Sequence, residues 1–368
     1  YNRVYEKYEF AKSNANKIGW KSNLEQSREF YETYGKAMIE KQFPNYANRI
    51  AVGLVGEGSD CFGFDDEQSR DHDFGPRFVM WVTRETYEEI GEELQKAYEE
   101  LPKMFLGVER IETFHGRDRA GVHMIEEFYQ QLTGIKSIND IGVTTWLETS
   151  EYSLAAAVNG EVFCDEEGIF TAWRAKLLEY YPKAVWYRRI AQECAVFSQN
   201  GQYNLPRMRQ RGQLVAAELA KAEGVKHAMK LIFLLERRYA PHDKWLYKDL
   251  QILEERGGLL TSACQQVEQK EKSVTALLER LSLLTVEEED AEEMSMLIET
   301  LAVIFAAALE QLGMVGRADA YLDANTKEIL LKSDALLKAG ENIIEELALG
   351  IVKEEFVAFD LETTGLSS

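Results

Sequence analysis

Residues 49–75 read RIAVGLVGEGSDCFGFDDEQSRDHDFG. The first seven residues form a short, mostly apolar run that predicts a buried strand. The Gly-, Asp- and Ser-rich residues 56–76 predict a loop. Phe78–Thr83 (FVMWVT) predicts a second strand. We therefore expect a glycine-rich loop held between two strands of one sheet.

The start of this loop has the residue types of a phosphate-binding turn. Gly56 and Gly58 have no Cβ, so their backbone can approach a ligand closely. Successive N–H groups in such a turn form a concave anion site, to which the Ser59 hydroxyl can add a donor. The structural alternative is an acidic turn whose aspartates only cap loops.

The end of the loop has the residue types of a metal site. Asp71 and Asp73 are two residues apart, so in extended chain their carboxylates lie on one face. Paired carboxylates together with substrate phosphates suit Mg²⁺. Phosphoryl transfer with two metals normally uses a third carboxylate. Our candidate is Asp165, at the end of the predicted strand Gly160–Asp165, with Glu161 as the second choice.

These residues resemble the signature of the DNA polymerase β-like nucleotidyltransferases, in which G-[GS] is followed after about ten residues by D-x-D. Here Gly58-Ser59 is followed, after eleven residues, by Asp71-His72-Asp73. Glu57 and His72 stand where the superfamily prefers apolar residues. The resemblance implies catalysis by Asp71, Asp73 and Asp165 with Mg²⁺ or Mn²⁺, and transfer of a nucleoside monophosphate, AMP from ATP first, to a hydroxyl.

Longer strings, including VNGEVFCD and YAPHDKWLYKDL, resemble an uncharacterised bacterial family of nucleotidyltransferase-like proteins over residues 25–350. This implies a helical C-terminal domain similar to that of aminoglycoside nucleotidyltransferases. By that analogy Lys244 and Tyr247 face the triphosphate. The alternative is a helix start in which Trp245 packs in the core and the lysines face solvent.

Three arginines are further candidates. Arg70 precedes Asp71 and can contact a phosphate or pair with an acid. Arg207 and Arg211 are i, i+4 neighbours, so they share a face of a predicted helix. We expect that face to contact substrate or phosphate, or to be a solvated face with ion pairs.

The patterns predict an α+β fold with a small mixed sheet, followed by helices alone. We place a catalytic domain with N-terminal helices at 1–182, a helical domain at 183–350 and a tail at 351–368. The predicted helices are 24–42, 86–101, 120–132, 170–180, 185–199, 206–235, 243–256, 260–284, 290–312 and 326–349.

Composition limits the partners. The net charge of −21 argues against a nucleic-acid partner and favours a small-molecule or protein acceptor. The four cysteines and five histidines show no zinc-site spacing. Residues 1–22 do not resemble a signal peptide, and the longest apolar run is too short to span a membrane, so we expect a cytoplasmic protein.

Two further points stay open at this stage. FDLETTG (359–365) resembles the first metal-binding motif of DnaQ-type exonucleases, with Asp360 and Glu362, but too few residues follow for that domain. We interpret it as a chance similarity or a fusion remnant. The alternative to a nucleotidyltransferase is a catalytically weak nucleotide-binding regulatory or interaction module. The acceptor, the preferred nucleotide and the oligomeric state are not predicted.

Overall fold

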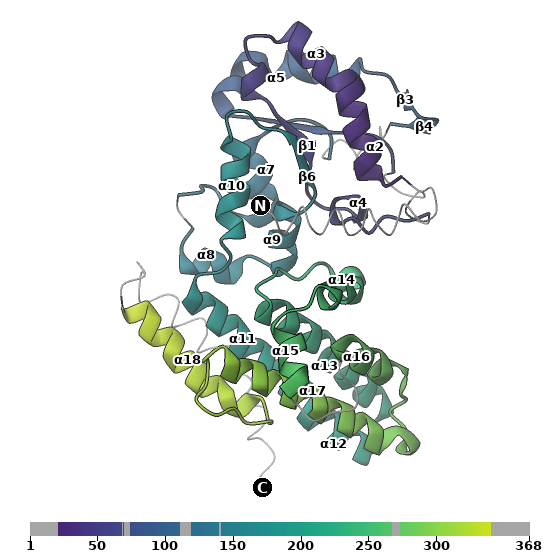
Figure 1. The fold of residues 1–368 in the computed structure, drawn as a ribbon, viewed down its shortest axis with the longest axis vertical. Coiled ribbons are helices and arrows are strands. Elements are labelled where there is room, and N and C mark those ends of the chain that lie inside the picture. The colour runs from purple at the N-terminus through teal and green to yellow at the C-terminus, as the bar shows by residue number, and fades with distance from the viewer. Residues whose placement is uncertain are drawn as a thin grey trace. The chain divides into compact units, whose positions relative to one another are not determined.

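A computed structural model of the chain describes residues 21–67, 69, 74–110, 119–139, 141–266 and 273–339. They form two compact units, coloured from purple to yellow along the chain in Figure 1. The mixed unit contains the described residues up to Ile141 and Thr149–Tyr180. The helical unit contains Gly142–Glu148 and the described residues from Tyr181 onward. All described strands belong to the mixed unit, so the predicted α+β class is confirmed.

Four strands of the mixed unit form one sheet, in the order β5 (Gly121–Met124), β2 (Val79–Val82), β1 (Ala51–Leu54) and β6 (Glu161–Cys164). The central strand β1 is antiparallel to both β2 and β6, whereas β2 and β5 are parallel. A separate hairpin pairs β3 (Met104–Phe105) with β4 (Val108–Glu109). The strands predicted near 49–55, 78–83 and 160–165 are all present.

The predicted helix at 120–132 is partly wrong. Its first residues form β5, and the helix α7 begins only at Ile125. The tertiary structure explains the difference, because Gly121–Met124 pair residue by residue with the fully buried strand β2. Backbone pairing to a neighbouring strand outweighs a local helical pattern, which is a weak determinant in a short segment.

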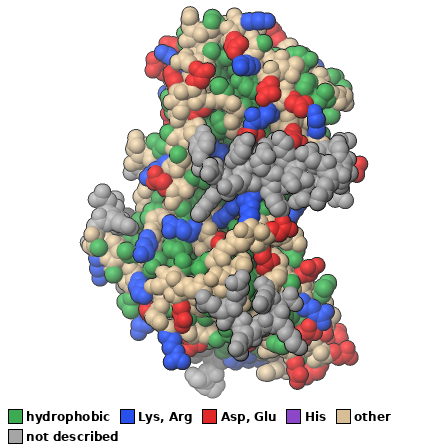
Figure 2. All heavy atoms as spheres, viewed as in Figure 1, with side chains coloured by type: hydrophobic (Ala, Val, Ile, Leu, Met, Phe, Trp, Pro, Cys, Tyr) green, Lys and Arg blue, Asp and Glu red, His purple; other side chains and the backbone are tan. Residues whose placement is uncertain are grey.

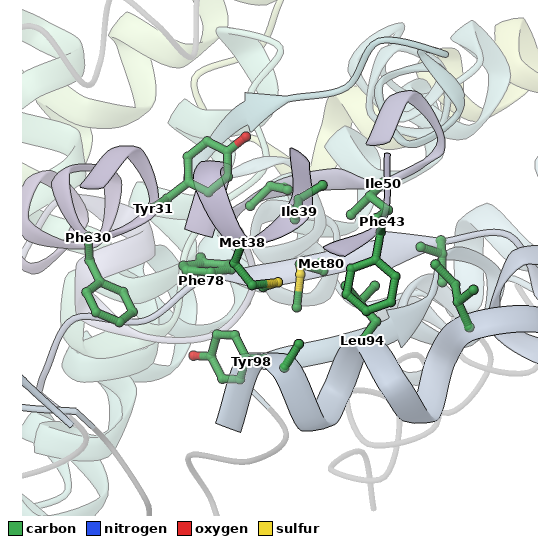
Figure 3. Close-up of a cluster of buried hydrophobic side chains, with 14 residues drawn as sticks. Phe30, Tyr31, Met38, Ile39, Phe43, Ile50, Phe78, Met80, Leu94 and Tyr98 are labelled. Carbon is green, nitrogen blue, oxygen red and sulfur yellow. The ribbon is translucent and has the colours of Figure 1, made fainter. Parts of the chain in front are cut away.

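One face of the sheet is covered by the N-terminal helix and by α5 (Arg84–Glu99). The N-terminal helix runs through α2 (Asn23–Phe30), a π-helical turn η1 (Tyr31–Gly35) and α3 (Lys36–Gln42). In Figure 3, side chains from both helices point at Phe78 and Met80 between them. Phe78 meets the ring of Tyr98 edge-on at 5.0 Å. This aromatic core fixes α2 against the start of β2.

The opposite face is packed around Trp81. Its indole stacks on Phe170 at 3.9 Å and meets Phe128 edge-on at 5.2 Å. Both faces of the central strands are therefore buried, which matches their continuous apolar runs. The helices that carry this layer are α7 (Ile125–Thr133), α9 (Glu151–Val158) and α10 (Ile169–Leu178), while the short elements α4 (Ser59–Phe62) and η2 (Ala47–Arg49) flank β1.

The helical unit follows the predicted pattern except at two helices. The predicted helix 260–284 is described as two helices, Leu259–Gln266 and Val274–Leu283, the second of which begins after the extended N-cap residue Ser273. The predicted helix 206–235 is divided at Arg211–Gln213, and a π-helical segment precedes it. The described elements are α8 (Val143–Glu148), α11 (Lys183–Phe197), η4 (Ser198–Asn204), α12 (Leu205–Gln210), α13 (Leu214–Leu235), α14 (Asp243–Glu255), α15 (Leu259–Gln266), α16 (Val274–Leu283), η5 (Glu288–Asp290), α17 (Ala291–Gln311) and α18 (Asp323–Lys338).

Close backbone packing holds the π-helical segment in the helical unit. A Cβ at Gly224 of α13 would lie 3.2 Å from the Cα of Gly201 in η4. The ring of Phe197 meets Phe305 of α17 edge-on. Among the helices that the structure describes, none has both the length and the apolar character needed to cross a membrane. On the face drawn in Figure 2, basic and acidic side chains are interspersed on both units.

Candidate functional site

The predicted phosphate turn lies directly after the central strand. We call residues 56–59 the glycine turn. β1 ends at Leu54, and the short helix α4 begins at Ser59. Gly56 and Gly58 have φ angles of 127° and 134°, a region that side-chain-bearing residues rarely adopt. A Cβ at Gly58 would also lie 2.6 Å from Asp60 Oδ1. Both conformation and space therefore require glycine at position 58.

The glycine turn is fixed to the start of β6 by a buried asparagine. The Asn159 side chain accepts a hydrogen bond from the Gly56 amide at 3.0 Å and donates to the Gly56 carbonyl at 2.7 Å. The Gly160 amide donates to the Cys61 carbonyl at 2.8 Å. Arg174 in turn donates to the carbonyls of Val158 and Asn159. The turn therefore has a defined position before any ligand binds.

Asp60, which follows the turn, belongs to a buried group of three polar side chains that we call the Asp60 cluster: Asn23, Asp60 and Arg77. Arg77 Nη2 lies 2.6 Å from Asp60 Oδ2, and Arg77 is 1% exposed. Asn23 Nδ2 donates to Asp60 Oδ2 at 2.7 Å, and the Cys61 amide donates to Oδ1 at 2.9 Å. Burial alone would raise the pKa of Asp60, but the Arg77 charge and these hydrogen bonds hold it below its usual value.

A second guanidinium lies at the glycine turn itself. Arg119 Nη1 would be 3.4 Å from a Cβ at Gly58. Arg119 comes just before β5, which begins at the same edge of the sheet at which β1 ends. Burial raises the pKa of the Cys61 thiol, and the Arg119 charge opposes that shift.

Glu57 places a negative charge on the exposed side of the same turn. It is hydrogen-bonded to Tyr152 of α9. Burial and then the Glu57 carboxylate raise the pKa of Tyr152 to about 12, while Arg119 opposes the shift. The ring of Tyr152 also stacks with Phe62 at 6.3 Å. The rim of the turn thus carries a cation and an anion together with a neutral tyrosine hydroxyl.

The strand register separates the two candidates for a third carboxylate. Leu54 pairs with Glu161, and Val52 pairs with Cys164, because β1 and β6 are antiparallel. Glu161 therefore lies at the glycine-turn edge of the sheet, whereas Asp165 lies at the opposite edge. Four residues of extended chain span roughly 13 Å. The geometry thus favours Glu161, the second choice from the sequence, over Asp165.

Both carboxylates have partners in the structure. Asp165 accepts hydrogen bonds from the amides of Gly168 at 3.1 Å and Thr171 at 2.7 Å, so it satisfies backbone amides at the start of α10, whose N-cap residue is Gly168. Glu161 forms an ion pair with Arg28 of α2, with Arg28 Nε 3.2 Å from Glu161 Oε2. A metal at Glu161 would have to compete with this guanidinium.

Arg70, Asp71 and Asp73 lie outside the described residues, as does FDLETTG (359–365) in the predicted tail. Within the described part of the chain, no group of three or more His, Cys, Asp or Glu side chains is placed to hold a metal ion. Of the acids described at the glycine-turn edge, Asp60 and Glu161 are each paired with an arginine, and Glu57 is hydrogen-bonded to Tyr152.

The two predicted nucleotide contacts of the helical unit face different surroundings. Tyr247 donates to the Thr275 carbonyl and to Glu279, both on α16, so its hydroxyl is used within the unit. Burial, followed by the Glu279 charge, raises its pKa. Lys244 lies with Lys248 beside the ring of Trp245, at 5.5 and 5.3 Å from its centroid. Lys244 is exposed and can reach a ligand, whereas Tyr247 cannot without losing its partners.

Arg207 and Arg211 differ in their surroundings and do not act as two equivalent side chains on one helix face. The Arg207 guanidinium donates to the Tyr203 hydroxyl and lies 4.5 Å from the centre of that ring. Arg211 is the exposed C-cap residue of α12. The intervening Arg209 donates to the carbonyls of Val286 and Glu287. Two of these three arginines therefore have partners within the helical unit.

Sequence reasoning did not identify Asn23, Asp60, Arg77 or Arg119. One of them, Arg77, carries a signal that could have found it. Arg77 is a lone charge directly before the apolar strand FVMWV, which is typical of a buried ion pair. Arg119 precedes a strand that the sequence pattern assigned to a helix, so its position at the sheet edge was hidden.

Three comparisons with known proteins extend this description. Residues 146–246 match the profile of a family described as a domain of unknown function (DUF4037). A search of the curated proteins finds no match. One similar solved structure is the nucleotidyltransferase-like protein from Exiguobacterium sibiricum 255-15, at 12% identity and a TM-score of 0.35, covering 83% of this chain and 90% of that chain. Similarity at this level does not establish a shared fold.

Proposed function

We propose that the mixed unit binds a nucleoside triphosphate at the glycine turn and transfers its nucleoside monophosphate to a hydroxyl of a small molecule or a protein. The observation that carries the proposal is the pairing of the glycine turn with Arg119. A backbone that needs glycine at position 58 lies against a guanidinium, and this combination suits a phosphate group.

The proposed roles follow from position. The backbone of the glycine turn and the Ser59 hydroxyl would donate to phosphate oxygens, and Arg119 would neutralise their charge. Asp71 and Asp73 would hold Mg²⁺ or Mn²⁺, with Glu161 in place of Asp165 as the third carboxylate. When bound, the metal would polarise the α-phosphate and stabilise the departing pyrophosphate. A carboxylate of this set would also accept the proton of the attacking hydroxyl.

The negative charge of the protein limits the class of acceptor molecule that we propose. The chain has a net charge of −21, which repels polyanions over most of its surface. Glu57 adds an exposed carboxylate at the turn itself. Both features favour a cationic small molecule or a protein segment over RNA or DNA as the acceptor. ATP is the first nucleotide to test.

The candidate contacts in the helical unit differ in their exposure and in the partners of their side chains. Lys244 and Arg211 are exposed and remain proposed phosphate or substrate contacts. Arg70 remains a proposed phosphate contact on its sequence position alone. Tyr247 and Arg207 would first have to leave Glu279 and Tyr203. We therefore rank them below Lys244 and Arg211.

One observation favours a second function, a nucleotide-binding regulatory module with little turnover. Glu161 is paired with Arg28, and Asp165 accepts a hydrogen bond from the Thr171 amide at the start of α10. If Arg28 holds Glu161 throughout, only Asp71 and Asp73 would remain for the metal. Such a site would bind a nucleotide and turn it over slowly.

Pyrophosphate release from each nucleoside triphosphate distinguishes the two functions. The assay would contain Mg²⁺ or Mn²⁺, candidate acceptors and cell extract, and would compare the wild type with Asp71→Ala and Asp73→Ala. Arg119→Met tests the phosphate contact, and Arg84→Met is its matched control, because Arg84 is exposed and pairs with Glu127 at the opposite sheet edge.

The two outcomes are distinct. Release that requires both aspartates and Arg119, but not Arg84, would support the transferase. Binding of nucleotide without release would support the regulatory module. An absence of binding to any nucleoside triphosphate, with or without metal, would overturn both.

A further inference from the structure

The side chain of Asn23 connects two parts of the mixed unit that lie far apart in sequence. It is fully buried in the first turn of α2. Its Nδ2 donates to Asp60 Oδ2 at 2.7 Å, and its Oδ1 accepts a hydrogen bond from the Gly75 amide at 3.2 Å. One amide group therefore ties the residue after the glycine turn to the segment that leads into β2.

Other contacts reinforce the same connection. The backbone amide of Asn23 donates to Asp65 Oδ2 at 2.7 Å. Ser27, one helical turn later and also fully buried, accepts a hydrogen bond from the Arg77 amide at 3.2 Å. Arg77 pairs with Asp60. The first two turns of α2 thus hold the residues at both ends of the segment 60–77.

Helix α2 is itself held firmly. A capping box fixes its N-terminus, with Ser22 and Glu25 satisfying each other's backbone amides. At its other end Phe30 is fully buried and contacts Phe78 at 5.8 Å. A rigid helix can therefore transmit a fixed position to the polar side chains at its start.

The glycine turn is directly sensitive to the position of Asp60. Asp60 Oδ1 lies 2.6 Å from the position that a Cβ on Gly58 would take. A shift of the Asp60 carboxylate therefore alters the space at the backbone of Gly58. Binding groups must be held within about 0.5 Å of their working geometry, and a displacement of about 1 Å costs roughly 100-fold.

We propose that Asn23 is a positioning residue for the proposed nucleotide site, and that it sets the glycine turn by holding Asp60 and Gly75 at a fixed separation. The inference rests on the proposed function. Asparagine suits the position because its amide presents one donor end and one acceptor end at once. Aspartate would retain the acceptor for Gly75 but place a second carboxylate against Asp60.

The test is an exchange of the two side chains. Asn23→Asp alone is expected to weaken binding of a Mg²⁺–nucleoside triphosphate at least about tenfold, because it breaks the contact with Asp60. The double variant Asn23→Asp/Asp60→Asn restores a donor opposite an acceptor between positions 23 and 60, and it leaves the net charge of the Asp60 cluster unchanged from the wild type. It is expected to recover most of the affinity. Affinity would be measured by calorimetry below the unfolding temperature of every variant.

A matched control separates positioning from stability. Gln26→Ala removes another buried polar side chain of α2, which donates a hydrogen bond to the Lys21 carbonyl at 3.0 Å and not to the glycine turn. It is expected to lower the unfolding temperature but to leave nucleotide affinity within about twofold. If Asn23→Asp does not fold, the nucleotide affinity of Asn23→Ser, which adds no charge, is compared with that of Gln26→Ala instead.

The outcomes distinguish the inference from the function on which it rests. A wild type that binds no nucleotide would overturn the proposed function, and the inference with it. A wild type that binds, with Asn23→Asp binding equally well, would overturn the inference alone. The same holds if Gln26→Ala weakens binding as much as Asn23→Asp does.

Discussion

The two edges of the sheet use acidic residues in different ways. At the glycine-turn edge, Asp60 is buried and held by Arg77 and Asn23, which come from distant parts of the chain. At the opposite edge, Asp165 accepts a hydrogen bond from a backbone amide at the start of α10, and Glu127 forms a solvent-exposed pair with Arg84. An acid at the end of a strand therefore does not by itself identify a site. Burial distinguishes Asp60 from Glu127, since the Asp60 side chain is 7% exposed and the Glu127 side chain is 44% exposed.

The largest effect is expected for Asp60→Ala, which leaves the buried Arg77 without its ion-pair partner. We expect a loss of about 3–5 kcal/mol in the free energy of unfolding, because an uncompensated buried charge is costly. Urea denaturation would measure it. Glu127→Ala, the control at the other edge, is expected to cost about 0–1 kcal/mol. Equal losses of unfolding free energy in Asp60→Ala and Glu127→Ala would show that the acids at the two edges do not differ in their contribution to stability.

Gly58→Ala is expected to cost about 1–3 kcal/mol, because it combines a strained φ of 134° with a close contact to Asp60. It should also weaken nucleotide binding. Gly134→Ala is the control, since Gly134 has a φ of 76° but open space around its Cβ position. It should cost about 1–2 kcal/mol and leave binding unchanged. Retained nucleotide affinity in Gly58→Ala would argue against the glycine turn as the phosphate site.

Asp165→Ala and Glu161→Gln together test which of the two residues is the third carboxylate of the proposed metal site. In Asp165→Ala, loss of the hydrogen bonds to amides at the start of α10 is expected to cost about 1 kcal/mol of stability, with metal-dependent nucleotide binding unchanged. Glu161→Gln is expected to weaken that binding, since Glu161 lies at the glycine-turn edge. Thermal unfolding and binding in Mn²⁺ would be measured for both. The reverse pattern would return the role to Asp165.

The smallest effect is expected in the pH dependence of stability. Because the folded state holds the pKa of Asp60 below its usual value, the ionised carboxylate stabilises the protein above that usual value, near 4. This contribution is lost as the pH falls through the lowered pKa of the folded state. Asp60→Asn is therefore expected to lose less stability than the wild type on acidification from pH 5 to pH 2. If the free energy of unfolding falls equally with pH in the wild type and in Asp60→Asn, Asp60 is not the group that causes the loss of stability in acid.

Local sequence predicted most elements but not every boundary. The runs at 49–55 and 78–83 became the paired strands β1 and β2, because both consist of apolar residues buried on both faces. Gly121–Met124 was assigned to a helix and is a strand, since only its neighbour β2 supplies the backbone partners. The break at Arg211–Gln213 in the second unit was also not predicted.

The sequence by itself determined the α+β class, the glycine turn with its required glycines, and the order of strand, loop and strand around it. These follow from hydrophobic period and backbone sterics, which act over a few residues. Only the tertiary structure placed Arg119 at the turn, joined Asn23 to Asp60 and separated Glu161 from Asp165. Those relations depend on strand register and on contacts between residues up to more than a hundred positions apart, such as Gly56 and Asn159, which no local pattern encodes.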